Sequence, residues 1–308
     1  MKKLNHIWIF SDSIKGHEIQ SQALATGLAK TIELFHCSIR QPWLSFAPRI
    51  LPRFGRNIIW EKSTPDCDNP PDVIITCGRR MAAVGKYFKR HSQCKHIQIL
   101  NPGDDYKKYD VLICPEHDGL KGKNVISTKG SLHGINADWL NKKKSQCQQQ
   151  SPDFSNKIMA LFLGNPSKAF YKDLEQLSNQ IREYCQGVDL YVCGSRRTHK
   201  KQHDKIKQHF SFAKHIWLNS DDGHNPYQCL LACSDAFIVT ADSINMLSET
   251  CETDKPVIAI GEKHISPKHQ RFIASLSDRL DTFDKQSTDI KSLNTLKQAL
   301  IKLEKLLD

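Results

Sequence analysis

Short apolar runs alternate with amphipathic stretches along the whole chain, and this alternation predicts strands and helices in turn. Apolar runs that predict strands lie at residues 7–10, 34–37, 73–76, 96–100, 111–114, 158–163, 188–193, 236–239 and 256–260. Amphipathic stretches that predict helices lie at residues 18–30, 80–90, 169–185 and 226–232. Strands that alternate with helices favour βα units around parallel sheets, so the sequence predicts an α/β fold.

The alternation is interrupted once, near the middle of the chain. Residues 141–157 read NKKKSQCQQQSPDFSNK and hold few apolar side chains, which is typical of an interdomain linker. We therefore expect an N-terminal domain at residues 1–145, a linker at 146–156 and a C-terminal domain at 157–308. Near the end of the chain, leucines at spacings of three and four predict a last amphipathic helix. Its apolar stripe favours packing in the core, and its final turns could cross back onto the first domain.

Composition indicates a soluble globular protein. The chain has 308 residues, of which 39% are hydrophobic and 25% charged. No apolar run approaches the length that crosses a bilayer, and MKKLNHIWIFSDS turns polar too early for a secretory signal, so we expect a cytoplasmic protein. The eleven cysteines include no CxxC pair, which favours buried reduced thiols over disulfides or zinc.

The formal net charge of +11 predicts an anionic partner. Nucleic acid, an anionic lipid surface and a phosphorylated small molecule all fit this charge. The basic residues are scattered, and no ribonucleoprotein motif, zinc-finger spacing or clear helix-turn-helix accompanies them. We therefore expect no nucleic-acid partner.

Residues 235–260 hold the strongest candidate site. The predicted strand 236–239 delivers Thr240, Asp242 and Ser243 to the open end of a sheet, where the start of the next helix favours phosphate. Glu249 follows near the same helix face, about as far along the axis as a ribose lies from the phosphates of a nucleotide. Because phosphate would repel a carboxylate, we assign Asp242 to capping the helix. The alternative is an ordinary βαβ unit whose Asp242 or Ser243 is only an N-cap.

Polar residues follow other predicted strands of the second half, where parallel sheets bind their ligands. Arg196 and Arg197 would clamp a pyrophosphate, and Asn225 and Tyr227 precede a helix where a nucleobase could stack or hydrogen-bond. Each of these residues alone is consistent with a scaffold role, and their convergence on one edge is the argument for a site. The nucleotide-binding candidates are Gly164, Asn165, Ser195, Arg196, Arg197, Asn225, Tyr227, Thr240, Ser243, Met246 and Glu249.

The first half offers a second set of candidates. The first strand runs into SDSIKGHEIQ, where Gly16 permits a tight turn and His17 opens a helix. A histidine at this position suits a general base, and the alternative is a capping or surface histidine. Gly78, Arg79 and Arg80 follow another strand, where they bind an anion or form structural salt bridges. The candidates of this half are Lys15, Gly16, His17, Gly78, Arg79, Arg80, His117, Asp118 and Asn124.

Several familiar catalytic motifs are absent from the sequence. It contains no GxSxG, HExxH, GK[ST] or GxGxxG element, and the His117-Asp118 pair has no third ligand close by. Hydrolysis by serine or zinc is therefore disfavoured, and we expect no bound metal.

Six segments, in chain order, carry a resemblance to a known family: SDSIKGHEIQSQALA, IITCGRR, CPEHDGLKGKNVISTKGSLHGI, GSRRTH, NPYQCLLACSDAFIVTADSINMLSET and DKPVIAI. The chain resembles the "elongated mitochondria" fission-factor family of plants and its bacterial relatives, some regarded as glycosyltransferases of the lipooligosaccharide outer core. The resemblance implies a GT-B-like architecture of two Rossmann-like domains facing across a cleft. It places a nucleotide-sugar donor on the C-terminal domain and the acceptor on the N-terminal one.

The resemblance implies a metal-independent glycosyltransferase with no bound cofactor and a donor of the UDP type. Arg196, Arg197 and the turn at residues 242–243 would stabilise the leaving diphosphate. Glu249 would accept from ribose hydroxyls, and His17 would take the acceptor's proton if the reaction inverts the anomeric centre. A retaining reaction would leave His17 without that role. The acceptor would be a lipid-linked glycan such as lipooligosaccharide core.

Two other functions remain open. A non-enzymatic peripheral protein would keep the fold for nucleotide binding or recruitment, as the fission role of the plant members suggests. A nucleotide-sugar epimerase is disfavoured, because it needs a bound dinucleotide and the sequence lacks GxGxxG.

Residues 42–60, PWLSFAPRILPRFGRNIIW, interleave aromatic and aliphatic side chains with arginines. This pattern predicts a peripheral contact with anionic lipid on the inner face of the membrane. The alternative is a basic loop folded on the first domain.

Overall fold

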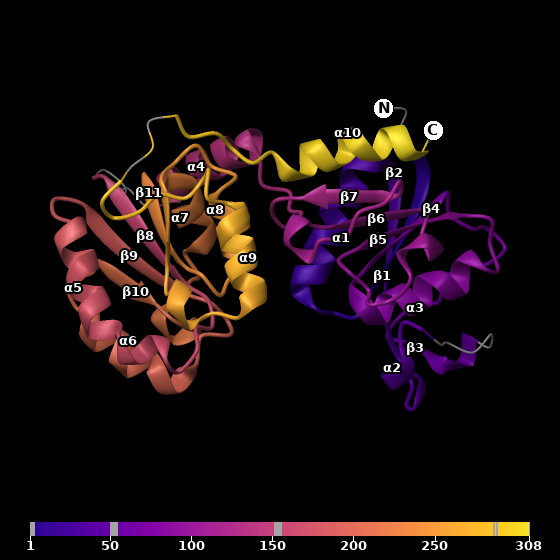
Figure 1. Cartoon of the computed structure of the whole chain (residues 1–308), viewed down its shortest axis with the longest axis horizontal. Coiled ribbons are helices and arrows are strands. Elements are labelled where there is room, and N and C mark those ends of the chain that lie inside the picture. Colours follow the sequence, from indigo (N-terminus) through magenta and orange to yellow (C-terminus); the bar gives the residue numbers. More distant parts are fainter. Residues whose placement is uncertain (1–3, 50–54, 151–155, 286, 288, 308) are drawn as a thin grey trace. The chain divides into compact units, whose positions relative to one another are not determined.

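The computed structural model describes residues 4–49, 55–150, 156–285, 287 and 289–307. The chain forms two compact units, shown in Figure 1. The first holds the chain up to Gly134 together with its last helix, and the second holds Ile135–Leu293.

The first unit is built on a seven-stranded sheet in the order β3-β2-β1-β4-β5-β6-β7. All neighbours are parallel except β3, which is antiparallel to β2. The strands are β1 (Leu4–Ser11), β2 (Ala29–Ile39), β3 (Ile58–Trp60), β4 (Val73–Cys77), β5 (Lys95–Ile99), β6 (Val111–Pro115) and β7 (Val125–Thr128). The helices are α1 (Lys15–Leu28), α2 (Trp43–Phe46), α3 (Gly78–Lys89) and α10 (Thr295–Leu307), with 3₁₀ turns η1 (Gly55–Asn57), η2 (Tyr106–Lys108) and η3 (Glu116–Asp118).

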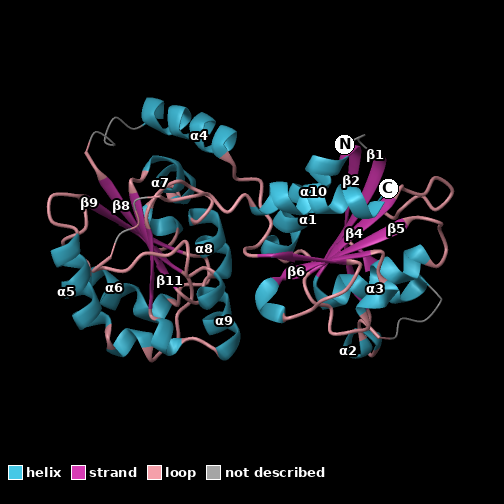
Figure 2. Cartoon of the chain, turned by 45° about the horizontal axis from the view of Figure 1, so that its top comes forward, coloured by secondary structure: helices cyan, strands magenta, loops and turns pink. Residues whose placement is uncertain are grey.

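Helices cover both faces of this sheet (Figure 2). Successive strand residues point to opposite faces, so Ile9 packs in the core that α1 and α10 cover, whereas Trp8 and Phe10 pack against Phe88 of α3. Burial on both faces explains why the strands read as continuous apolar runs. Helix α10 packs closely on α1, since a Cβ at Gly27 would lie 2.7 Å from Leu300 Cδ1.

The second unit is built on a five-stranded, all-parallel sheet in the order β10-β9-β8-β11-β12. Its strands are β8 (Ile158–Leu163), β9 (Asp189–Gly194), β10 (His215–Trp217), β11 (Ala236–Thr240) and β12 (Val257–Ile260). Its helices are α4 (Ala137–Gln150), α5 (Leu174–Tyr184), α6 (His203–His209), α7 (Tyr227–Cys233), α8 (Ile244–Thr250) and α9 (Pro267–Ser275). Short 3₁₀ turns are η4 (Phe170–Lys172), η5 (Lys200–Gln202), η6 (Ser220–Asp222) and η7 (Glu262–His264).

The predicted domain boundary at residue 145 is wrong. Residues 137–150 form helix α4 of the second unit, so the linker expected at 146–156 begins inside a helix, and residues 151–155 lie outside the described residues. The helix has a polar exposed side rich in Lys and Gln, while Trp139 and Leu140 pack against the core. Its apolar stripe is too narrow for composition to distinguish it from a linker.

The expectation that the cysteines are reduced fails at one pair. Cys147 of α4 and Cys229 of α7 form a disulfide across 82 residues of sequence. Nine other cysteines are free thiols, and eight of these are buried. Cysteine spacing did not predict the bond, because the two residues are distant in sequence and only the folded chain brings α4 and α7 together.

The structure also splits the helix predicted at residues 169–185 into η4 and α5. None of the helices in the described part of the chain is both long and apolar enough to cross a membrane.

Candidate functional site

Three loops of the second unit meet where β8, β9 and β11 end. The Gly164 N–H donates to Thr240 Oγ1 at 2.8 Å, which joins the loop after β8 to the end of β11. The hydroxyls of Ser195 and Thr198 donate to the Gly164 carbonyl at 2.9 and 2.7 Å, which joins the same loop to the turn after β9. Because β8 lies between β9 and β11, Gly164 is the point at which both neighbours are attached.

Asp242 does not cap helix α8, contrary to the sequence interpretation. The N-cap residue is Ser243, which makes no capping side-chain bond, and Asp242 Oδ2 instead accepts from the backbone N–H of Asn165 at 2.7 Å. A Cβ at Gly164 would lie 2.6 Å from this oxygen, so only glycine lets the two loops approach. Its other oxygen, Oδ1, is buried and has no hydrogen-bond partner among the described residues. The carboxylate holds the β8 loop in place.

Glu249 projects from α8 and pairs with a residue of another helix. The phenolic hydroxyl of Tyr227, at the start of α7, donates a hydrogen bond to Glu249 Oε2. Burial raises the pKa of Glu249 to about 7, although the Tyr227 hydrogen bond lowers it. Burial and the nearby Glu249 raise the pKa of Tyr227 well above its usual value. The ring of Tyr227 lies 4.6 Å from that of Phe162 on β8, which fixes the hydroxyl at this edge of the sheet.

The paired arginines lie on an exposed turn immediately after β9. The backbone N–H of Arg197 donates to Ser195 Oγ at 3.2 Å, while both guanidinium groups are exposed. No ion pair within the described part of the chain occupies Arg196 or Arg197. Both charges are therefore available to an external anion.

The remaining nucleotide-binding candidates have structural contacts of their own. Asn225 Oδ1 accepts from the Tyr227 backbone N–H at 2.9 Å and so caps α7. Met246 packs against the core, and Ser243 is buried. Beside Asp242, a hollow of only about 10 Å³ is lined by Ser167, Phe170, Thr240, Gly261 and His264, among others. This volume holds one water molecule at most.

In the first unit, His17 contacts two loops at the carboxyl end of the sheet. Its Nδ1 lies 3.1 Å from Asp12 Oδ1, in the loop after β1. Its ring also lies against Gly78, the first residue of α3, where a Cβ would lie 2.6 Å from His17 Cε1. Burial raises the pKa of Asp12, but the hydrogen bond and charge of His17 outweigh it and the net pKa is lowered. An imidazole that donates through Nδ1 to a carboxylate keeps Nε2 free to accept a proton.

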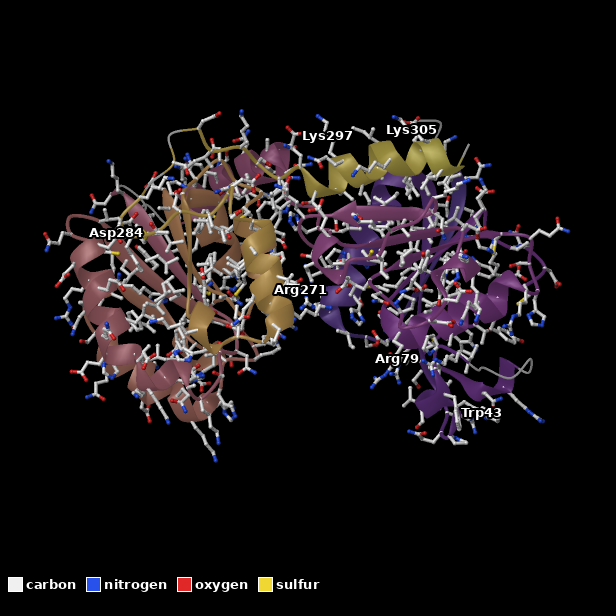
Figure 3. The ribbon with its side chains drawn as sticks, in the orientation of Figure 1. Trp43, Arg79, Arg271, Asp284, Lys297 and Lys305 are labelled. Atoms are coloured by element: carbon white, nitrogen blue, oxygen red, sulfur yellow. A yellow bond between two sulfur atoms is a disulfide. The ribbon has the colours of Figure 1, made fainter. Side chains whose placement is uncertain are left out.

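The structure brings only some of the other first-half candidates to this edge. Arg79 and Arg80 are exposed at the start of α3, beside Gly78, and Figure 3 labels Arg79. Lys15 pairs with Glu18 at 2.8 Å, one turn along α1. Gly16 accepts a hydrogen bond from the Gln20 side chain through its carbonyl.

The prediction that Asn124 lies at the site edge of the sheet is wrong. It precedes β7, beside the start of β6, and therefore lies at the amino edge of the sheet. Its amide donates to the carbonyls of Tyr106 and Tyr109, so it stabilises a loop. His117 and Asp118 form η3 after β6, and the His117 ring is buried 3.8 Å from Asp118 Oδ1. Order along the chain could not tell which end of β7 the asparagine would occupy.

Two contact residues were not among the site residues predicted from the sequence. Asp12 follows β1 directly, and Thr198 ends the GSRRT turn, so both stand where ligand-binding residues are expected. The signal was present at each position, but only the folded loops show the bonds to His17 and Gly164.

Among the described residues, no group of three or more His, Cys, Asp or Glu side chains could hold a metal ion. The edges described here offer backbone N–H groups, hydroxyls, guanidinium groups and single carboxylates.

Residues 15–299 match the family described as mitochondrial fission ELM1. The chain belongs to the mitochondrial fission ELM1 family. Within the family, it is 27% identical to the Arabidopsis thaliana mitochondrial fission protein ELM1 over 68% of this chain and 56% of that protein. It thus spans about half the length of the plant relative. An uncharacterised protein of Rickettsia prowazekii, RP120, is 28% identical over 89% of this chain and 88% of its own length.

Solved structures share the fold of this family member at low sequence identity. A UDP-GlcNAc 2-epimerase from Neisseria meningitidis, bound to UDP-GlcNAc, aligns with a TM-score of 0.54 and 12% identity over 99% of this chain and 100% of that one. MurG from Acinetobacter baumannii aligns with a TM-score of 0.52 and 10% identity over 98% of this chain and 95% of that one. Together with the parallel sheets, these likenesses show the GT-B fold class, with two Rossmann-like domains.

Proposed function

We propose that the protein is a metal-independent glycosyltransferase that uses a nucleotide-sugar donor of the UDP type. The observation that carries the proposal is the edge of the second sheet. There Gly164 joins three loops, two unpaired arginines follow β9, and the Glu249 carboxylate is held by Tyr227. The fold likeness to proteins that include a UDP-GlcNAc-bound epimerase supports this choice of ligand.

Each group at this edge has a part in binding the donor. Arg196 and Arg197 neutralise the diphosphate, whose charge grows as the bond to the sugar breaks. Glu249 accepts from ribose hydroxyls, which replace the Tyr227 hydroxyl or share the carboxylate with it. Asp242 carries negative charge beside the β8 loop, so it opposes phosphate binding there and restricts where the diphosphate lies.

The first unit supplies the acceptor side in this proposal. His17, held through Nδ1 by Asp12, removes a proton from the acceptor hydroxyl through Nε2 as that oxygen attacks the anomeric carbon. This role belongs to an inverting reaction. We extend the proposal to a lipid-linked glycan acceptor such as lipooligosaccharide core, which the resemblance to bacterial relatives implies.

Titration calorimetry with UDP, GDP and CMP tests the donor site. We expect UDP to bind the wild-type protein, and Glu249→Ala and Arg197→Ala each to weaken binding by about tenfold or more, because each removes a charged hydrogen-bonding partner. Glu183→Ala and Arg182→Ala are matched controls, since both residues are exposed on α5 of the same unit. Binding that ignores the Glu249 and Arg197 changes, or no nucleotide binding at all, would reject the donor site.

A second candidate function is nucleotide binding without turnover, which the family's fission role favours. Transfer or hydrolysis of a UDP-sugar separates the two functions. Under the enzymatic proposal, His17→Ala lowers turnover by about 100-fold or more while UDP affinity stays within about twofold. A wild-type protein that binds UDP but never consumes a UDP-sugar in the presence of glycolipid acceptors would favour the binding role.

A further inference from the structure

The part of the chain that runs from within β2 to the end of β3 has an unusual charge pattern. Residues 34–60 contain no Asp or Glu, and four arginines stand among aromatic and aliphatic side chains. They are Arg40, Arg49, Arg53 and Arg56. Residues 50–54 lie outside the described residues. We call residues 38–49 and 56–60 the edge segment.

The edge segment lies at the border of the seven-stranded sheet. Strand β3 is the outermost strand and pairs with β2, and the Arg40 N–H donates to the Asn57 carbonyl at 2.9 Å. Ser38 is opposite Ile59, so their side chains and that of Arg40, two residues on, share one face. Figure 1 shows α2 beside β3, away from α10.

Apolar groups of this segment divide between core and solvent. Trp43 and Leu44 pack partly against the core, so helix α2 is held on the unit. Phe46 and Ile59, in contrast, are 50% and 43% exposed. The ring of Phe46 lies 6.2 Å from that of Trp43, which supports it from one side. One part of the segment is therefore folded onto the first unit, as the alternative of a folded loop expects, and another part exposes its apolar side chains to solvent.

Two arginines of the edge segment, Arg40 and Arg49, keep charges that no other described residue neutralises. Arg40 and Arg49 are exposed, and neither forms an ion pair with any residue in the described ranges. The Arg49 N–H donates to the Phe46 carbonyl at 2.9 Å, so a free guanidinium group follows directly on an exposed aromatic ring. Exposed apolar groups beside unpaired arginines fit an anionic lipid bilayer, in which acyl chains lie beneath negatively charged headgroups.

We propose that the edge segment binds the surface of an anionic lipid bilayer, with Phe46 and Ile59 entering the interface and Arg40 and Arg49 facing headgroup phosphates. A second copy of the chain is a poorer occupant, because a symmetric contact would bring the arginines of two edge segments together, and the segment itself holds no acidic residue to offset them. Nucleic acid would leave Ile59 without an apolar partner. The proposal does not rest on the proposed enzymatic function, although it fits a lipid-linked acceptor and a location on the inner face of the membrane.

Cosedimentation with vesicles tests the proposal on the full chain. One set contains phosphatidylcholine alone and the other phosphatidylcholine mixed with phosphatidylglycerol. We expect the wild-type protein to bind the anionic vesicles only, and salt to weaken this binding. In the Arg40→Glu/Arg49→Glu variant, the partition coefficient should fall about tenfold or more. Phe46→Ser lowers the partition coefficient severalfold, because an aromatic side chain leaves the interface.

The last helix provides matched controls on the same unit. Lys297→Glu/Lys305→Glu makes the same change in net charge on α10, and Figure 3 labels both lysines at the end of the unit opposite Trp43. Ile301 is 51% exposed, so Ile301→Ser matches Phe46→Ser. The proposal is overturned by equal binding to both vesicle types, by binding to neither, or by control variants that lose as much binding as the edge-segment variants.

Discussion

The imidazole of His17 lies directly against the backbone of Gly78, and it occupies the space that a side chain at position 78 would need. A Cβ there would lie 2.6 Å from His17 Cε1, and the φ of Gly78 is +78°. The start of α3 thus limits how the His17 ring can move, while Asp12 holds its Nδ1. These two contacts fix the direction of Nε2.

Gly78→Ala is expected to destabilise the protein by about 2–4 kcal/mol, because it adds a clash with His17 to the cost of a left-handed backbone. Gly103→Ala is the control. Its φ is +72° and nothing lies within 4 Å of the added Cβ, so it carries only the backbone cost of about 1–2 kcal/mol. Denaturant unfolding measures both, and equal losses would show that His17 moves aside freely.

Stability should depend on pH through Glu249. Its pKa is raised from near 4.5 to about 7 in the folded protein, so between these values the folded state binds more protons than the unfolded state. The free energy of unfolding therefore falls as pH rises from about 4.5 to 7 and then levels off as far as this group is concerned. Glu249→Gln should remove that part of the slope. A variant with the wild-type slope would contradict the raised pKa.

Nucleotide affinity should show the opposite dependence on pH, if Glu249 accepts from ribose. The ionised carboxylate is the better acceptor, so UDP affinity weakens as pH falls through about 7. Tyr227→Phe removes the hydrogen bond that lowers the pKa of Glu249, and the midpoint should move to higher pH. Calorimetry across pH measures this shift. An unmoved midpoint would assign the titration to another group.

Asp242→Asn should raise UDP affinity severalfold. The change removes a negative charge beside the β8 loop while an amide oxygen can still accept from the Asn165 N–H. Circular dichroism and thermal unfolding check that the loop contact survives. If affinity falls instead while the loop contact survives, the charge of Asp242 does not oppose the diphosphate and the carboxylate supports binding.

The Cys147–Cys229 disulfide should stabilise the second unit. Replacing both cysteines with serine is expected to lower the free energy of unfolding by about 2–4 kcal/mol, because the closed loop spans 82 residues. Wild-type protein unfolded with and without a thiol reductant gives the comparison. The double variant should be insensitive to reductant, and an equal response of the two proteins would contradict the bond.

Local pattern was sufficient to predict the strands that make the centre of both sheets. Buried runs such as residues 73–76 and 158–163 are apolar without interruption because helices cover both faces. Short edge strands such as β3 and β10 bury less and leave a weaker signal, and α4 was mistaken for a linker because most of its side chains face water.

The site, too, has residues that local sequence predicts and contacts that it does not predict. The positions of Gly16, His17, Ser195, Thr240 and Glu249 follow from the order of strands and helices, since strand ends in a parallel sheet share one edge. Asp242 was assigned to a cap because the nearest helix was the only partner that sequence could offer. Its actual partner, Asn165, lies 77 residues away.

The sequence by itself determined the α/β alternation, the basic charge and the identity of the polar groups at the strand ends, because these depend on neighbours along the chain. Only the tertiary structure decided that Tyr227 pairs with Glu249, that Cys147 meets Cys229 and that Asn124 lies at the far edge. Such contacts depend on how distant elements pack, and packing is set by the whole core rather than by local pattern.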